Sequence, residues 1–123
     1  MRHTWGYKFS RNHMIPERIA QIEATLRNSP NIPDATRQEL LDLFSSLKTE
    51  VAPLVKSHGE SVDQIAGSAD AAVQAAVRRE ERPEEAAQAV EGLAASVRDF
   101  EASHPKLVQI VDRLAVTLSN MGI

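Results

Sequence analysis

Residues 34–56, DATRQELLDLFSSLKTEVAPLVK, decide the fold of this chain. Large apolar side chains recur in this stretch at alternating spacings of four and three residues, at Leu40, Phe44, Leu47, Val51 and Leu54. Such spacing is typical of an amphipathic helix that buries one face along its length. The stretch therefore predicts a helix over residues 34–56. Proline lacks the backbone N–H that a helix interior needs, so we expect this helix to kink or end near Pro53.

The same helical spacing returns before and after this stretch. It begins at Ile15, runs through an Ala-rich segment over residues 62–80, and resumes on either side of Pro105. No part of the chain is expected to form a strand. We therefore expect an all-α fold of four to five helices, arranged as antiparallel helical hairpins or a bundle with coiled-coil-like seams. Whether residues 62–103 form one kinked helix or two stays open at this point.

The central positions of two of these helices form a candidate packing or oligomer seam. Its eight members are Leu40, Phe44, Leu47, Val51, Leu107, Val111, Leu114 and Leu118. Near-heptad spacing of this kind suits left-handed helix packing, either within one chain or between chains. The seam of residues 62–80 is narrower, because alanine buries little area. We therefore expect a homo-oligomer or a complex with another protein.

Five residues are candidate structural caps, which satisfy free backbone groups at helix ends. They are Asn31, Ser61, Ser103, His104 and Gly122. Asn31 is expected to cap the helix of residues 34–56, and Ser61 stands three residues before Gln64, as in a capping box. Ser103 and His104 are expected to hold the turn before the last helix. Gly122 suits a left-handed position after that helix, where Ile123 can fold back onto Leu118.

Length, cysteine content and charge set further limits. A chain of 123 residues and 13.5 kDa has room for one domain, and without cysteine it forms no disulfide and no thiolate metal site. Residues 1–14 carry three basic and no acidic side chains, whereas residues 15–123 hold 11 basic and 17 acidic ones, a net charge of −6. An acidic body argues against nucleic acid as a partner, because phosphate neutralisation needs clustered Lys and Arg.

Residues 1–14 form a basic-aromatic leader ahead of a single helical domain of residues 15–123. Trp5, Tyr7 and Phe9 alternate in the leader at a spacing of two, which is typical of a strand. So short a segment cannot bury these rings by itself, and we expect it to be mobile. The alternative is an arm that binds nucleic acid or an anionic surface. Whether residues 1–13 belong to the native product stays open.

Membrane and secretion signals are not recognisable in the sequence. No apolar run approaches the ~18 residues of a membrane span, and no apolar segment follows the basic start as in a secretory signal. We therefore expect a cytoplasmic protein with no integral membrane association.

The polar residues predict no catalytic, cofactor-binding or metal-binding site, and hence neither an enzyme nor a cofactor. None of the four histidines pairs with another at the i, i+4 spacing of a helical metal site. His58 with Glu60 and Asp63 is the least poor metal trio, but a Ser/Gly connector would hold it loosely. His104, directly before Pro105, is the alternative centre of a small enzyme or regulator.

The end of the chain resembles a known family. The segments Ser103-His104-Pro105-Lys106-Leu107 and Leu118-Ser119-Asn120-Met121-Gly122-Ile123 are similar to the hallmark of domain of unknown function family 4404, a bacterial family. The helix pair of residues 15–56 resembles that family's N-terminal half. Residues 57–82 are longer than the middle expected for the family, and residues 1–13 precede its usual start. The resemblance implies a small cytoplasmic helical protein and brings no established activity.

These features favour a non-enzymatic helical interaction or oligomerisation module. The second hypothesis is peripheral binding to a lipid or polymer-granule surface through amphipathic helices. Helices of that kind usually carry a basic polar face, whereas the polar faces here are acidic.

Overall fold

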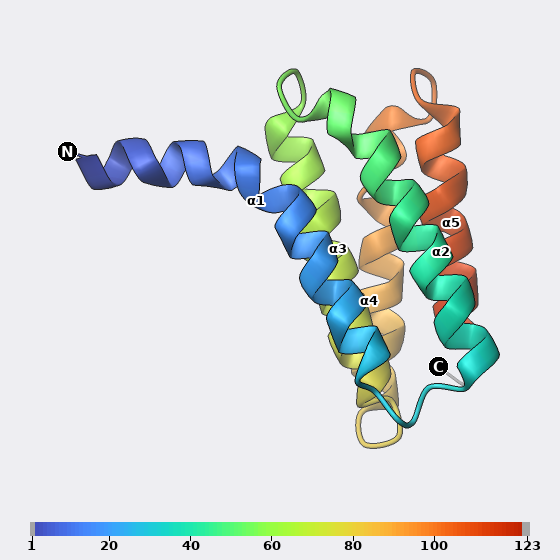
Figure 1. Ribbon diagram of the computed structural model, residues 1–123. Coiled ribbons are helices and arrows are strands. Elements are labelled where there is room, and N and C mark those ends of the chain that lie inside the picture. The colour runs from blue at the N-terminus through green and yellow to red at the C-terminus, as the bar shows by residue number, and fades with distance from the viewer. Residues whose placement is uncertain (1, 122–123) are drawn as a thin grey trace.

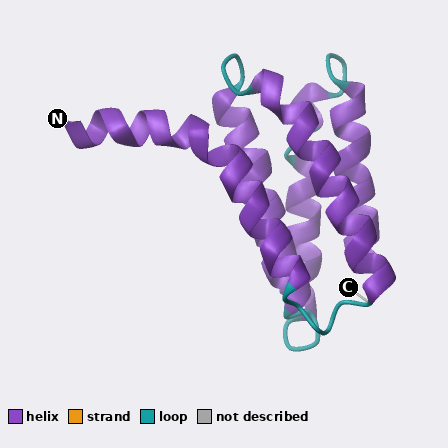
Figure 2. Ribbon diagram, in the orientation of Figure 1, coloured by secondary structure: helices purple, strands orange, loops and turns teal. Residues whose placement is uncertain are grey.

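The computed structural model describes residues 2–121, with side chains from residue 15 onward. Its elements are α1 (Arg2–Arg27), α2 (Asp34–Val51), η1 (Ala52–Leu54), α3 (Gly59–Val77), α4 (Pro83–Ala95), η2 (Arg98–Phe100) and α5 (Pro105–Ser119), where η denotes a 3-10 helix. Every regular element within residues 2–121 is helical, as Figure 2 shows. The prediction of an all-α fold with four to five helices is therefore confirmed.

Successive α-helices run in opposite directions, as Figure 1 shows. α3 packs against α1 and α4, α2 packs against α1 and α5, and α4 also packs against α5. A turn over residues 78–82 separates α3 from α4, and Pro83 occupies the first turn of α4. Residues 62–103 therefore form two α-helices and the short η2. Successive helices are antiparallel, whereas α1 and α3 pack while running in the same direction.

One cluster of buried apolar side chains, supplied by all five α-helices, forms the core. All eight candidate seam residues belong to this cluster, and none of them is more than 2% exposed. Burying a side chain of the size of Leu or Phe contributes roughly 1.5–3 kcal/mol. The contact between α2 and α5 is thus a principal source of stability. Because these eight side chains face the core of their own protomer, a second chain must use another surface.

α1 begins well before the position that the sequence indicated. The prediction placed the helix start at Ile15, with Pro16 in the first turn, but α1 starts at Arg2 and Pro16 lies inside it. A proline removes one hydrogen bond and bends a helix without always ending it. Figure 1 shows that the first half of α1 extends away from the bundle and the second half packs on it.

The helix boundaries near Pro53 and Pro105 lie closer to the positions that the sequence predicted. α2 ends at Val51 and passes into η1, which contains Pro53 in its first turn, so the predicted end of this helix is confirmed. Pro105 likewise occupies the first turn of α5. Each ring sits where the missing N–H has no helical partner to lose.

The predicted caps at Asn31 and Ser61 are wrong. Pro33 holds the N-cap position of α2, and Asn31 instead donates through Nδ2 to the carbonyl oxygen of Val77 at 2.7 Å. Ser61 lies inside the first turn of α3, because that helix starts two residues earlier, at Gly59.

The histidine junction before α5 also differs from the prediction. His104 does hold the N-cap position of α5, but its side chain makes no capping hydrogen bond. Ser103 is exposed and precedes the cap, too early to reach the first-turn N–H groups. The predicted cap at Gly122, with Ile123 folding onto Leu118, lies outside the described residues.

Candidate functional site

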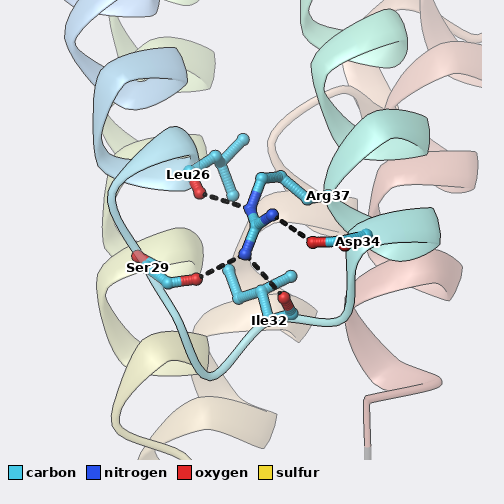
Figure 3. A network of polar contacts seen from close by, with 5 residues as sticks. All are labelled: Leu26, Ser29, Ile32, Asp34 and Arg37. Carbon is cyan, nitrogen blue, oxygen red and sulfur yellow. Dashed lines mark hydrogen bonds and ion pairs between the residues drawn. The ribbon is translucent and has the colours of Figure 1, made fainter.

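Arg37 on α2 holds the connection between α1 and α2, as Figure 3 shows. Its guanidinium donates to the carbonyl oxygens of Leu26 at 3.0 Å, Ser29 at 2.9 Å and Ile32 at 2.8 Å. Nη1 also pairs with Asp34 Oδ1 at 2.6 Å. The first two carbonyls belong to the end of α1 and the residues just after it, and each also accepts one turn hydrogen bond at 3.3 Å, from Ser29 N and Ile32 N respectively. Arg37 therefore reinforces the C-terminal end of α1.

Arg79 plays a similar role at the same end of the bundle. Its Nε donates to the carbonyl oxygen of Met121 at 2.7 Å, Nη1 to that of Ala76 at 3.0 Å, and Nη2 to that of Asn31 at 3.2 Å. Asn31 in turn donates to Val77, so the loop before α2 and the end of α3 bind each other twice. The guanidinium group of arginine has five N–H donors, so it can bind several carbonyl oxygens that point toward one place.

An open groove of about 710 Å³ runs between the outer faces of α2 and α5. It is lined by Glu39, Leu43, Lys106, Gln109, Ile110, Asp112, Arg113, Val116, Thr117 and Asn120. Val116 is 54% exposed, and it is the one large apolar side chain of residues 15–121 that is mainly solvent-exposed. Leu43 and Ile110 lie in the same groove and are largely buried. The groove thus combines a short apolar floor with a polar border.

Charges of both signs border this groove. Arg113 Nε lies 3.1 Å from Glu39 Oε2, and the Thr117 hydroxyl donates to the same oxygen at 3.1 Å. Lys106 Nζ lies 3.6 Å from Glu50 Oε2 at the other end of the α2–α5 contact. Exposed pairs of this kind each contribute at most about 1 kcal/mol, so they set the charge pattern more than the stability.

Three rings from separate segments meet at the opposite end of the bundle. The ring centroids of His58 and His104 are 6.0 Å apart, and those rings lie 5.4 Å and 5.5 Å from Phe100. Phe100 is only 3% exposed, whereas His58 is exposed and His104 is half-buried. The Ser57 hydroxyl lies 2.8 Å from Nδ1 of His58. The two histidines therefore rest on a fixed apolar ring with access to solvent.

The trio of His58, Glu60 and Asp63 does not form a metal cluster. Asp63 pairs with Arg18 of α1 at 3.2 Å, and within the described part of the chain no three His, Asp, Glu or Cys side chains form a group that could hold a metal ion. The structure instead brings His58 next to His104, 46 positions along the chain, a pairing that sequence spacing could not show.

Sequence reasoning also missed both arginines that bind backbone carbonyls. Their acceptors come from turns and helix ends up to 48 positions away, and such contacts leave no periodic pattern. The available signal was chemical: each arginine lies close in sequence to a helix end rich in free backbone groups.

These observations define a small all-α bundle with a His-Pro junction before its last, amphipathic helix. Residues 45–123 match the family described as Domain of unknown function (DUF4404), so the chain belongs to this family. The match includes residues 57–82, the segment that we expected to be longer than the family's middle. Most of the helix pair of residues 15–56 lies outside the match.

No curated protein and no solved structure matches the chain. Among the described residues, no helix is both long enough and apolar enough to cross a lipid bilayer.

Proposed function

We propose that this protein is a non-enzymatic helical interaction module that forms a homodimer through the groove between α2 and α5. The observation that carries this proposal is the exposure of Val116, 54% of which is accessible within a groove that also contains Leu43 and Ile110. Apolar surface exposed in a groove with a polar border is typical of a protein contact site.

The order of residues along the groove favours a second copy as the partner. In a two-fold dimer the same patch serves both copies, so each residue pair occurs twice. An antiparallel arrangement centred near Arg113 sets Val116 of one copy over Ile110 and Leu43 of the other. The apolar floor of the groove is thus complementary to itself when reversed.

The charge of the groove supports a protein partner over a polyanion. Its lining holds two basic residues, Lys106 and Arg113, and two acidic ones, Glu39 and Asp112. A nucleic acid or an anionic membrane would need an excess of positive charge on this face. Mixed charge instead favours register and orientation between two protein surfaces.

Light scattering over a micromolar concentration series tests the proposal. The full chain is expected at twice its protomer mass of 13.5 kDa, and Val116→Asp is expected to shift it to the protomer mass. Gln74→Asp, at an exposed position of α3 outside the groove, serves as the matched control and should stay dimeric. A protomer mass for the unmodified chain at every concentration would overturn the homodimer. A dimer that is indifferent to Val116→Asp would overturn the choice of surface.

A further inference from the structure

His58 and His104 stand at the same end of the bundle, each at the N-cap position of a helix. Their ring centroids are 6.0 Å apart, and both rings pack on Phe100. Because Phe100 is 3% exposed and belongs to the core cluster, it fixes the surface on which the two imidazoles lie. The arrangement is a paired-histidine site, open to solvent, on a rigid base.

We propose that His58 and His104 together bind one divalent transition-metal ion of the Cu²⁺, Ni²⁺ or Zn²⁺ class. Imidazole nitrogen binds such ions at about 2.0–2.1 Å, and the ring centre lies about 1.2 Å behind that nitrogen, so two rings that share one ion have centres at most about 6.5 Å apart. The separation of 6.0 Å lies within that limit, and the planes of the two rings cross at 81°.

The contact between Ser57 and His58 prepares one nitrogen for the metal. When Nδ1 of His58 donates its proton to the Ser57 hydroxyl at 2.8 Å, Nε2 carries the free lone pair. Metal-binding histidines commonly have their other nitrogen held in this way, because the bond fixes both tautomer and ring orientation. Within residues 15–121, the His104 ring contacts the rings of His58 and Phe100 and makes no hydrogen bond, so its nitrogens are free to turn toward the ion.

Two features limit the affinity of the site and the type of ion that it binds. The positive ends of two helix dipoles disfavour a cation, and two imidazoles leave the remaining coordination positions to water. Within the described residues no third His, Asp, Glu or Cys completes a group of three. Binding is therefore expected to be modest, and restricted to ions that prefer nitrogen. Mg²⁺ and Ca²⁺ prefer oxygen ligands and should not bind here.

Calorimetric titration with Ni²⁺ tests the site in the full chain. The reference carries His3→Gln and His13→Gln, which removes the two imidazoles outside the proposed pair. We expect one equivalent of Ni²⁺ to bind the reference and no heat from Mg²⁺. Adding His58→Gln or His104→Gln should each weaken the affinity by at least about tenfold, since each removes half of the protein ligands. Circular dichroism checks that both variants remain helical.

Electron paramagnetic resonance of bound Cu²⁺ supplies a second readout. If the two rings had only a structural role, this spectrum would not depend on them. The Cu²⁺ spectrum of the reference should show coupling to two imidazole nitrogens, and each single variant should show coupling to one. Unchanged Ni²⁺ affinity in folded His104→Gln would overturn the shared site, and so would the absence of one-equivalent binding to the reference. If the light-scattering experiment fails while Ni²⁺ binding succeeds, the metal site stands without the homodimer.

Discussion

Arg79 Nε donates to the main-chain oxygen of Met121 at 2.7 Å, joining two residues that are 42 positions apart. This contact fastens the end of α5 to the end of α3, two helices that otherwise share few contacts. Both residues lie within the part of the chain that matches the family. Met121 is therefore held by a specific donor as well as by apolar packing.

Replacing Arg79 by lysine is expected to lower the free energy of unfolding by about 1–3 kcal/mol, because an ammonium group cannot reach three carbonyl acceptors at once. Urea denaturation measures the loss. Arg78→Lys is the matched control, because Arg78 is adjacent, exposed and of the same charge. A comparable loss in both variants would contradict the role given to the Arg79 fork.

Arg37→Lys is expected to destabilise the connection between α1 and α2 by about 1–3 kcal/mol, since three carbonyl oxygens lose their shared donor. The ion pair of Arg37 with Asp34 contributes less, because the Asp34 side chain is 97% exposed. Thermal unfolding of Arg37→Lys and Asp34→Ala compares the two contributions. If Asp34→Ala lowers the melting temperature as much as Arg37→Lys, the ion pair rather than the carbonyl contacts holds this connection.

Two helix-interior glycines provide a matched pair. A Cβ atom at Gly92 meets nothing within 4 Å, so Gly92→Ala should stabilise the protein by about 0.5–1 kcal/mol through helix propensity alone. A Cβ atom at Gly67 lies 3.3 Å from Nη2 of Arg18. The same guanidinium pairs through Nη1 with Asp63.

Gly67→Ala should consequently gain less stability than Gly92→Ala, because Arg18 must move to make room for the added methyl group. Chemical denaturation of both variants gives the comparison directly. Equal gains at the two positions would show that Arg18 yields without loss.

Deleting residues 1–13 is expected to leave the melting temperature within about 2 °C of the full chain. The described core starts at Ile15, which is 1% exposed, and Figure 1 shows the preceding half of α1 pointing away from the bundle. Differential scanning calorimetry of the two forms provides the measurement. A drop well beyond this range would show that the first half of α1 packs on the protein.

The helices of this fold could be predicted from apolar spacing, and the reason is visible in the core. Leu40, Phe44, Leu107 and Leu114 are buried because each recurs on the one face that its helix turns inward. Pro53 marked a helix end correctly for an equally local reason, the missing backbone donor. Pro16 misled the same reasoning, since a proline within a helix leaves most of its other hydrogen bonds intact.

The polar contacts could not be predicted in the same way. Asn31 had the chemistry of a cap, but its amide reaches Val77 across the bundle, and only the packing of α1 on α3 brings the two together. His58 and His104 are neighbours for the same kind of reason, because α3 and α5 both begin at one end. Contacts between distant turns depend on how the helices assemble, and a single sequence carries no periodic trace of them.

Alanine supplies five of the eight buried residues of α3. Shortening an alanine side chain removes very little buried apolar area. A larger side chain, in contrast, must displace a neighbour in the close-packed interior, which typically costs about 1–3 kcal/mol of stability. The buried positions of α3 therefore tolerate exchange of one small residue for another. Larger residues there require compensating changes on α1 or α4.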